Sequence, residues 1–282
     1  VARHPSLRTS FVWEELDQPQ QVVWSTADVP WEVVDWSGQP RYELKRRWSQ
    51  LLEEDRRAGM DLELAPLLRA TLVRLDRDEH LLLLTTHHIV IDGWSLVVLM
   101  REVFASYGGQ APAHRPFELR DYVRWLRRRP SEAALWAAEL GGVSPSPLRL
   151  PPPGDPSGGP AEQSAVLDQA TASALEGAAR AQGLRMATLY EAAWAIVLRL
   201  YTQRSDVTFG VVVAGRPPDL PGAELAIGPF IHMLPLAVSV DPARPVREWL
   251  DELERRTAAL NGRHASLQDV ARATGRRADE LF

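Results

Sequence analysis

The chain has 282 residues, 45% of them hydrophobic and 24% charged, which is ordinary for a soluble globular protein with one large domain or two smaller ones. Its formal net charge of −5 argues against a general nucleic-acid binder, because neutralising phosphates requires a concentrated positive surface. The absence of cysteine excludes disulfides, thiolate metal sites and a cysteine nucleophile, and no apolar run is long enough to span a membrane.

Apolar runs and helical periodicity alternate along the first half of the sequence. Four β-rich runs, grouped in two pairs with a short turn inside each pair, predict strands at 9–14, 21–25, 68–75 and 80–86. Apolar residues at helical spacing predict helices at 42–58, at 95–107, and twice within 117–140, where Pro130 breaks the pattern. We expect each strand pair to be antiparallel.

The composition changes at residues 141–160, which are rich in Gly, Pro and Ser. This segment predicts a linker between an N-terminal lobe over 1–140 and a C-terminal lobe over 161–282. After the linker, strands are expected near 163–168, 206–213 and 233–240, and helices near 171–182, 186–202 and 246–260. Because helices and strands are mixed in both parts, the predicted fold class is α/β, with two lobes of the α+β two-layer kind.

The segment TTHHIVIDGWS, residues 85–95, is the strongest candidate for a functional site. His87 and His88 follow a predicted strand and precede a predicted helix, a loop position that often presents catalytic groups. Adjacent residues in extended backbone point to opposite faces, so only one of the two imidazoles can face a given cavity. Asp92 lies among apolar residues and needs a cationic or hydrogen-bonding partner. Gly93 permits unusual backbone angles and a close approach by a substrate.

Two other interpretations of the histidines stay open at this point. A histidine that follows a strand is often a core or surface residue without a catalytic role. A zinc site is the second alternative, but adjacent histidines seldom both bind one metal, and the sequence offers no cysteine and no His-rich partner segment. We therefore expect no metal site.

The stretch HHIVIDG matches HHxxxDG, a motif of the condensation domains of nonribosomal peptide synthetases. Further segments resemble motifs of that family in the same order along the chain, namely RHPSLRTSF (3–11), APLLRATLVRL (65–75), RDYVRW (120–125), DVTFGVVVAGRP (206–217) and IGPFIHMLPLAV (227–238). The resemblance covers nearly the whole chain. The sequence looks most like the subtype that joins an L-configured donor to an L-configured acceptor.

The resemblance implies two chloramphenicol acetyltransferase-like lobes in a V-shaped pseudodimer with a tunnel through the middle. Family members are longer, so we expect both ends to be truncated and the second lobe to be incomplete. The implied reaction forms a peptide bond between an upstream acyl or peptidyl thioester and the α-amine of a downstream aminoacyl thioester. Both substrates would arrive on the 4'-phosphopantetheine arms of peptidyl carrier proteins.

The same resemblance implies a cellular setting. The partners would be the upstream and downstream carriers and the neighbouring domains of a larger cytoplasmic synthetase for antibiotics or siderophores. No cofactor is expected in the domain itself, and neither nucleic acid nor a membrane is expected as a partner.

The resemblance also assigns roles to residues. It places His88 on the tunnel side as the catalytic residue, where a neutral imidazole can accept the amine proton or orient the amine. His87 is expected to brace the loop, and Asp92 is expected to form a structural ion pair with Arg8. Gly93 would leave room for the thioester or offer its N–H to an oxyanion. The expected tunnel lining consists of Trp94, Ser95 and His232.

Three points stay open. The chain has IHMLP where the family usually has INTLP, so His232 is either a substrate contact or a tolerated replacement. The arginines of RWLRRRP (124–130) are interpreted as a solvated helix face, with an acidic carrier protein or its phosphate as the alternative partner. The alternative functions are an ester-forming acyltransferase with a hydroxyl acceptor and a non-catalytic module that docks carrier proteins.

Overall fold

The computed structural model describes residues 1–110, 115–143 and 164–282. The chain forms two compact units: the first comprises Val1–Arg129 with Arg216–Phe230, and the second comprises Pro130–Gly215 with Ile231–Phe282. This division differs from the predicted lobes 1–140 and 161–282, because it falls at Pro130 and because a later segment returns to the first unit. Most of the predicted linker lies outside the described residues.

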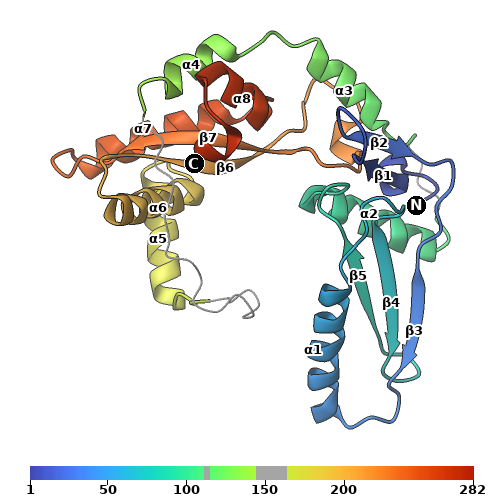
Figure 1. The fold of residues 1–282 in the computed structure, drawn as a ribbon. Helices are drawn as coiled ribbons and strands as arrows, with labels where there is room; N and C mark the ends of the chain where they lie inside the picture. Colours follow the sequence, from blue (N-terminus) through green and yellow to red (C-terminus); the bar gives the residue numbers. More distant parts are fainter. Residues whose placement is uncertain (111–114, 144–163) are drawn as a thin grey trace. The chain divides into compact units, whose positions relative to one another are not determined.

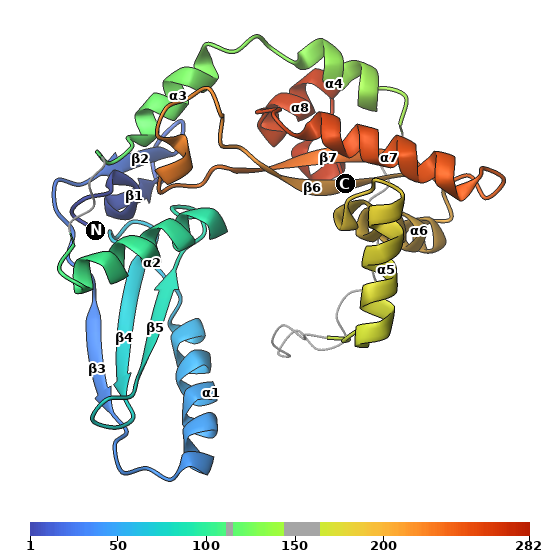
Figure 2. The ribbon, with the colours of Figure 1, turned by 180° about the vertical axis from the view of Figure 1, so that it is seen from behind.

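The first unit mixes strands and helices. Its strands are β1 (Thr9–Val12), β2 (Gln20–Val23), β3 (Trp31–Asp35), β4 (Leu68–Arg74) and β5 (His80–Thr86). Its helices are α1 (Arg41–Ala58), α2 (Gly93–Tyr107) and α3 (Leu119–Arg127), with short 3-10 turns η1 (Pro5–Arg8) and η2 (Ala223–Leu225). Strands β1 and β2 form an antiparallel hairpin, while β4 is the central strand of a sheet, parallel to β3 and antiparallel to β5. Figures 1 and 2 show α1 alongside this sheet and α2 where β5 ends.

The core of the first unit explains why the later segment returns to it. Strand β4 buries Leu68, and helix α2 buries Val98 and Leu99 next to Leu7 of η1. Ile227, from the returning segment, belongs to the same cluster and is only 2% exposed. Since burying a large aliphatic side chain contributes roughly 1.5–3 kcal/mol, this segment is part of the hydrophobic core and not a surface loop.

The second unit packs helices against a two-stranded antiparallel sheet. Its strands are β6 (Asp206–Ala214) and β7 (Ile231–Ser239). Its helices are α4 (Ala133–Leu140), α5 (Gln169–Ala181), α6 (Met186–Thr202), α7 (Val246–Leu260) and α8 (Leu267–Thr274), followed by the turn η3 (Ala278–Glu280). Val207 of β6 and Leu234 of β7 are fully buried. They belong to one hydrophobic cluster with Ala195 of α6 and with Leu281 near the end of the chain. This unit therefore has a core of its own.

Most predicted elements are confirmed, including both antiparallel pairs of the first half and the helix pair around Pro130. The strand predicted near 163–168 is wrong where the structure describes it, because 164–168 is irregular and Val166 is 94% exposed. Strand β3 and helix α8 were not predicted. The mixture of helices and strands in the structure confirms the predicted α/β class. Within the described ranges, no helix combines the length and apolarity needed to cross a membrane.

Candidate functional site

The loop between β5 and α2 begins with a histidine that the backbone holds in place. The His87 N–H donates to the carbonyl of Leu67 at 3.0 Å, and the His87 carbonyl accepts from Val90 N–H at 3.2 Å. The ring Nδ1 accepts from the Ile89 N–H at 3.1 Å, so the neutral ring carries its proton on Nε2. These contacts support the prediction that His87 braces the loop.

His88, the next residue, is different. Its side chain is exposed, and among the described residues it takes part in no hydrogen bond or ion pair. A side chain in this state has both ring nitrogens available to a ligand. The loop thus fixes His87 through backbone contacts, whereas His88 has no hydrogen-bonding partner among the described residues.

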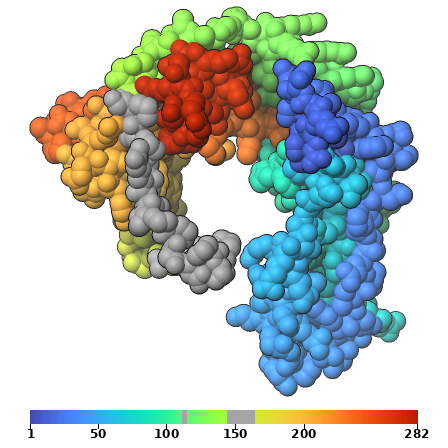
Figure 3. All heavy atoms as spheres, in the orientation of Figure 1, coloured from blue at the N-terminus to red at the C-terminus, as the bar shows by residue number. Residues whose placement is uncertain are grey.

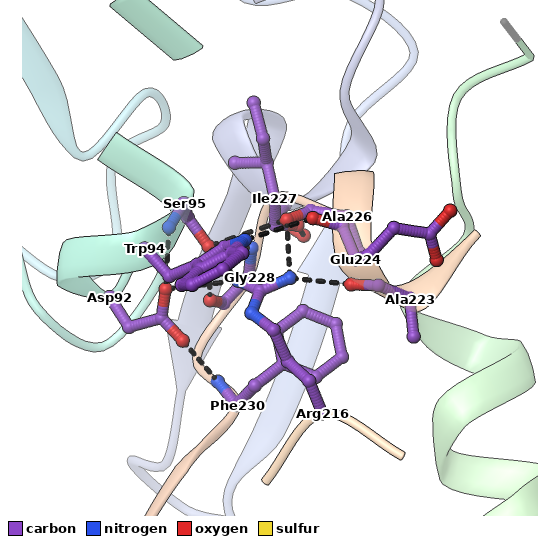
Figure 4. Close-up of polar contacts among 11 residues, drawn as sticks. Asp92, Trp94, Ser95, Arg216, Ala223, Glu224, Ala226, Ile227, Gly228 and Phe230 are labelled. Atoms are coloured by element: carbon purple, nitrogen blue, oxygen red, sulfur yellow. Dashed lines mark hydrogen bonds and ion pairs between the residues drawn. The ribbon is translucent and has the colours of Figure 1, made fainter. Parts of the chain in front are cut away.

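Asp92 ends the loop as the N-cap of α2 and is only 2% exposed. Its Oδ1 accepts from the Ser95 N–H at 2.7 Å, its Oδ2 accepts from the Phe230 N–H at 3.0 Å, and Arg216 Nη2 lies 3.0 Å from Oδ1. Figure 4 shows these contacts converging on the carboxylate. Burial by itself would raise the pKa of Asp92, but hydrogen bonds from Ser95 and Phe230 and the charge of Arg216 outweigh it and hold that pKa below its usual value.

The predicted ion pair of Asp92 with Arg8 is wrong. The Arg8 guanidinium instead donates to the carbonyls of Trp24 and Ser25, which follow β2, and so fixes the end of the hairpin. The partner of Asp92 is Arg216, 124 residues further along the chain, in the segment that returns to the first unit. Arg8 is closer in sequence, but its side chain is used by its own hairpin.

Arg216 connects the helix to the returning segment. Its Nη1 donates to the carbonyls of Ala223 at 2.6 Å and Ala226 at 2.9 Å, and its guanidinium lies 4.2 Å from the ring centroid of Phe230. Its Nη2 also donates to Ser95 Oγ at 2.6 Å. A planar guanidinium with several donors suits such a site, because it satisfies three acceptor groups and one carboxylate at once. The sequence offered one signal for it, an arginine two positions after the mainly apolar run 207–214.

Ser95 is a structural residue and does not line a tunnel, contrary to the prediction. It is fully buried, its hydroxyl donates to the Gly228 carbonyl at 2.8 Å, and it accepts from the Gly228 N–H at 3.1 Å. Trp94 is 60% exposed, and its Nε1 donates to the Glu224 carbonyl at 2.9 Å. Both residues tie the start of α2 to residues 224–228.

Gly93 is the first residue of α2 and is exposed. Its backbone is not in the left-handed region, so the conformational freedom that glycine permits is not used here. A Cβ added at this position would meet no atom within 4 Å among the described residues. The glycine therefore leaves open space beside the loop, and the use of that space by a substrate stays a prediction.

His232 lies on β7 in the second unit and is half-buried. Its ring is edge-on to that of His264, with 5.6 Å between centroids, and burial lowers its pKa. Nothing in these contacts tests its predicted place in a tunnel. Across the described part of the chain, no group of three or more His, Asp or Glu side chains is arranged to hold a metal ion.

The sequence matches the model of a known protein family and is similar to short parts of much longer known proteins. Residues 1–280 match the sequence model of the condensation domain family. The chain is 37% identical over 290 residues to chondramide synthase cmdD of Chondromyces crocatus, a match that covers 96% of this chain and 7% of that protein. It is 35% identical over 267 residues to a linear gramicidin synthase polypeptide of Brevibacillus parabrevis, covering 90% of this chain and 3% of that protein. The chain thus spans less than a tenth of the length of these relatives.

Two solved structures are similar in fold. The first condensation domain of the calcium-dependent antibiotic synthetase superposes with a TM-score of 0.67 at 25% identity, covering 92% of this chain and 63% of that one. The SgcC5 protein of Streptomyces globisporus superposes with a TM-score of 0.77 at 23% identity, covering 97% and 64%. At this identity the second comparison concerns the fold alone.

Proposed function

This chain belongs to the condensation domain family, and from that premise we propose that it forms an amide bond between two carrier-bound substrates. The α-amine of an aminoacyl thioester attacks the carbonyl carbon of an upstream acyl or peptidyl thioester. A C–N bond forms, the C–S bond breaks, the amine loses one proton, and the departing thiolate gains one. Both thioesters are held on 4'-phosphopantetheine arms, and no further cofactor enters the reaction.

His88 is the residue we assign to this chemistry. Its imidazole is exposed and takes part in no hydrogen bond or ion pair among the described residues, so it can accept the amine proton or orient the amine by a hydrogen bond. Gly93 lies five residues further on, at the start of α2, and its lack of a side chain leaves room for the thioester. Positioning two tethered reactants removes much of the entropic barrier, so either role for the imidazole suffices.

The observation that carries this proposal is the contrast between a free histidine and a fixed aspartate within one loop. The buried ion pair of Asp92 with Arg216 and the hydroxyl of Ser95 hold the start of α2 on the returning segment. A loop anchored in this way keeps His88 in one place without using its side chain. Preorganised groups of this kind cost no rearrangement when a reaction occurs.

The carriers, the neighbouring domains and a cytoplasmic setting follow from the same proposal.

The test of the proposal is a reconstituted reaction. Two carrier domains, each loaded with its thioester, are mixed with the domain, and the product is identified by mass spectrometry. The expected product is an amide on the downstream carrier. A parallel reaction with a hydroxyacyl thioester as acceptor tests the ester-forming alternative, and equal or faster ester formation contradicts the amide proposal. Carrier binding without any product supports a non-catalytic docking module.

A further inference from the structure

A groove in the first unit has four arginines among its twelve lining residues. It lies between helix α3 on one side and η1, β1 and β2 on the other, and has a volume of about 660 Å³. Its charged lining residues are Arg8, Arg120, Arg124 and Arg127, against a single carboxylate, Glu118. In Figure 3 the dark blue N-terminal residues lie beside the green residues that include α3. In a chain whose net charge is −5, this is a local concentration of positive charge.

The three helical arginines form a stripe on one face of α3. They occur at spacings of four and three residues, so they project from the same side and extend over roughly 10 Å of helix. The opposite side of the helix buries Tyr122 against Phe230, with 4.9 Å between ring centroids. The arginine face is therefore the solvent-facing half of an amphipathic helix.

Stabilisation of the helix does not account for this stripe. Arginines in the last turn of a helix complement its dipole, which explains Arg124 and Arg127. Arg120, however, lies in the first turn, where a cation is unfavourable, and Arg8 comes from a different element yet lines the same groove. Two of these residues have exposed ion pairs of little energetic value: Arg120 with Glu118 at 2.5 Å and Arg124 with Asp121 at 3.0 Å.

The remaining features of the groove suit a protein partner. Arg127 has no carboxylate within 4 Å among the described residues, so its charge is available. Val123 is 40% exposed and Val23 of β2 is 56% exposed, and both line the groove. The stripe from Arg120 to Arg127 extends over roughly 10 Å of helix, which is longer than a single phosphate. An amphipathic helix with carboxylates at matching spacing satisfies the arginines and covers the valines.

We propose that this groove docks the acidic, amphipathic helix of a carrier domain. The proposal rests on the proposed function, because that function supplies the carrier as the partner. Docking of this kind depends on complementary charge, which raises the rate of association and fixes the orientation of the partner. The affinity is therefore expected to fall as the ionic strength rises.

The test measures binding without turnover. The probe is an unloaded carrier domain whose helix presents three carboxylates, and its counterpart carries Gln or Asn at those positions. The variant Arg120→Glu/Arg124→Glu/Arg127→Glu is expected to weaken the Kd for the first probe by about 10-fold or more, and to change the Kd for the second much less. A Gln version of the same three changes keeps the test valid if the Glu version unfolds.

A matched control makes the same change in net charge elsewhere in the first unit. Arg41, Arg56 and Arg57 of α1 have side chains that are 91%, 72% and 74% exposed, and their triple change to Glu is expected to leave the Kd within about twofold of the unchanged protein. Equal weakening by both triple variants would show a general charge effect and would overturn the groove as a docking site. Tighter binding of a single-stranded oligonucleotide than of the carrier would overturn it as well.

His88→Ala separates this inference from the proposed function. It is expected to bind the carrier as the unchanged protein does, although it is expected to form little amide. Amide formation that persists in His88→Ala contradicts the catalytic assignment and leaves the docking result intact. Normal carrier binding by the groove variant contradicts the docking surface and leaves the catalytic assignment intact.

Discussion

The two ends of the loop from His87 to Asp92 are built in opposite ways. At one end His88 is exposed and has no hydrogen-bonding partner among the described residues. At the other end Asp92 is 2% exposed and accepts hydrogen bonds from Ser95, Arg216 and Phe230. The residues are four positions apart, yet one end is part of the core and the other is open to a ligand.

Under the proposed mechanism, this difference lets a short motif combine two tasks. A reactive imidazole needs free ring nitrogens and also a fixed position, and a flexible loop could not provide both. The buried end supplies the fixed position through an ion pair that reaches across 124 residues. Substitutions at the two ends should therefore have separable effects, with stability lost at one and activity lost at the other.

The largest loss of stability is expected for Asp92→Ala. The change leaves the guanidinium of Arg216 buried without its counterion, which costs roughly 3–5 kcal/mol. Denaturant unfolding, followed by tryptophan fluorescence, measures the free energy. The exposed ion pair of Asp121 with Arg124 provides the control, since Asp121→Ala is expected to cost less than about 1 kcal/mol. An unchanged unfolding free energy in Asp92→Ala, with activity lost, would make Asp92 a reacting group.

His88→Ala is expected to act in the opposite way. Loss of proton transfer or orientation lowers the rate of amide formation by about 100-fold or more, equivalent to roughly 2.7 kcal/mol. The unfolding free energy should stay within about 0.5 kcal/mol, because the side chain is exposed and takes part in no hydrogen bond or ion pair among the described residues. His80, also exposed and at the other end of β5, serves as control, and His80→Ala should leave both quantities unchanged. Turnover at the normal rate in His88→Ala would remove the histidine from the mechanism.

Ser95→Ala tests the buried end without removing a charge. The hydroxyl accepts from Arg216 and exchanges hydrogen bonds with Gly228, so its loss leaves buried polar groups unsatisfied at a cost of about 1–3 kcal/mol. Its effect should be smaller than that of Asp92→Ala and should be seen in the unfolding free energy before it is seen in the rate. A full loss of activity in a variant of normal stability would restore Ser95 to the substrate tunnel.

Acid should weaken the same anchor in a graded way. The pKa of Asp92 is lower in the folded protein than its usual value of 3.8, so the carboxylate stabilises the fold fully above that usual value. This stabilisation is lost as the pH falls toward the folded pKa. Protonation removes the charge of the carboxyl but leaves its atoms in place. The unfolding free energy is measured from pH 7 down to pH 3 for the protein and for Asp92→Asn. The variant should show a smaller dependence on pH, and parallel curves would mean that Asp92 does not titrate in this range.

The sequence predicted the elements whose local pattern is strong and missed those whose pattern is not. Strands β4 and β5 are apolar runs around a turn, and both were predicted together with their antiparallel pairing. Strand β3 is exposed along nearly its whole length, so it has no alternation of buried and exposed residues to detect. Helix α8 is short, although its capping box of Ser266 and Asp269 was visible in the sequence.

The candidate site shows the same limit at a longer range. The motif and the resemblance singled out His88, Asp92 and Gly93, because all three lie within one short stretch of the sequence. They did not identify Arg216, since the return of residues 216–230 to the first unit depends on tertiary packing and not on local spacing. A buried carboxylate requires a partner, but the sequence does not state which of many arginines supplies it.

Gly93 directly follows the buried end, and its substitution should change stability least. It is the first residue of α2, its backbone is accessible to any residue, and an added Cβ would meet nothing within 4 Å among the described residues. Gly93→Ala is therefore expected to keep or raise the unfolding free energy, by less than about 1 kcal/mol, because it restricts the unfolded chain. Gly93→Leu extends a larger side chain into the same open space and should fold equally well. If a thioester passes there, carrier binding is retained in Gly93→Leu while the amide yield falls, and the yield in Gly93→Ala falls less. Normal yields in both variants would mean that the open space beside the loop is not on the path of the substrates, and that the glycine faces away from the reaction.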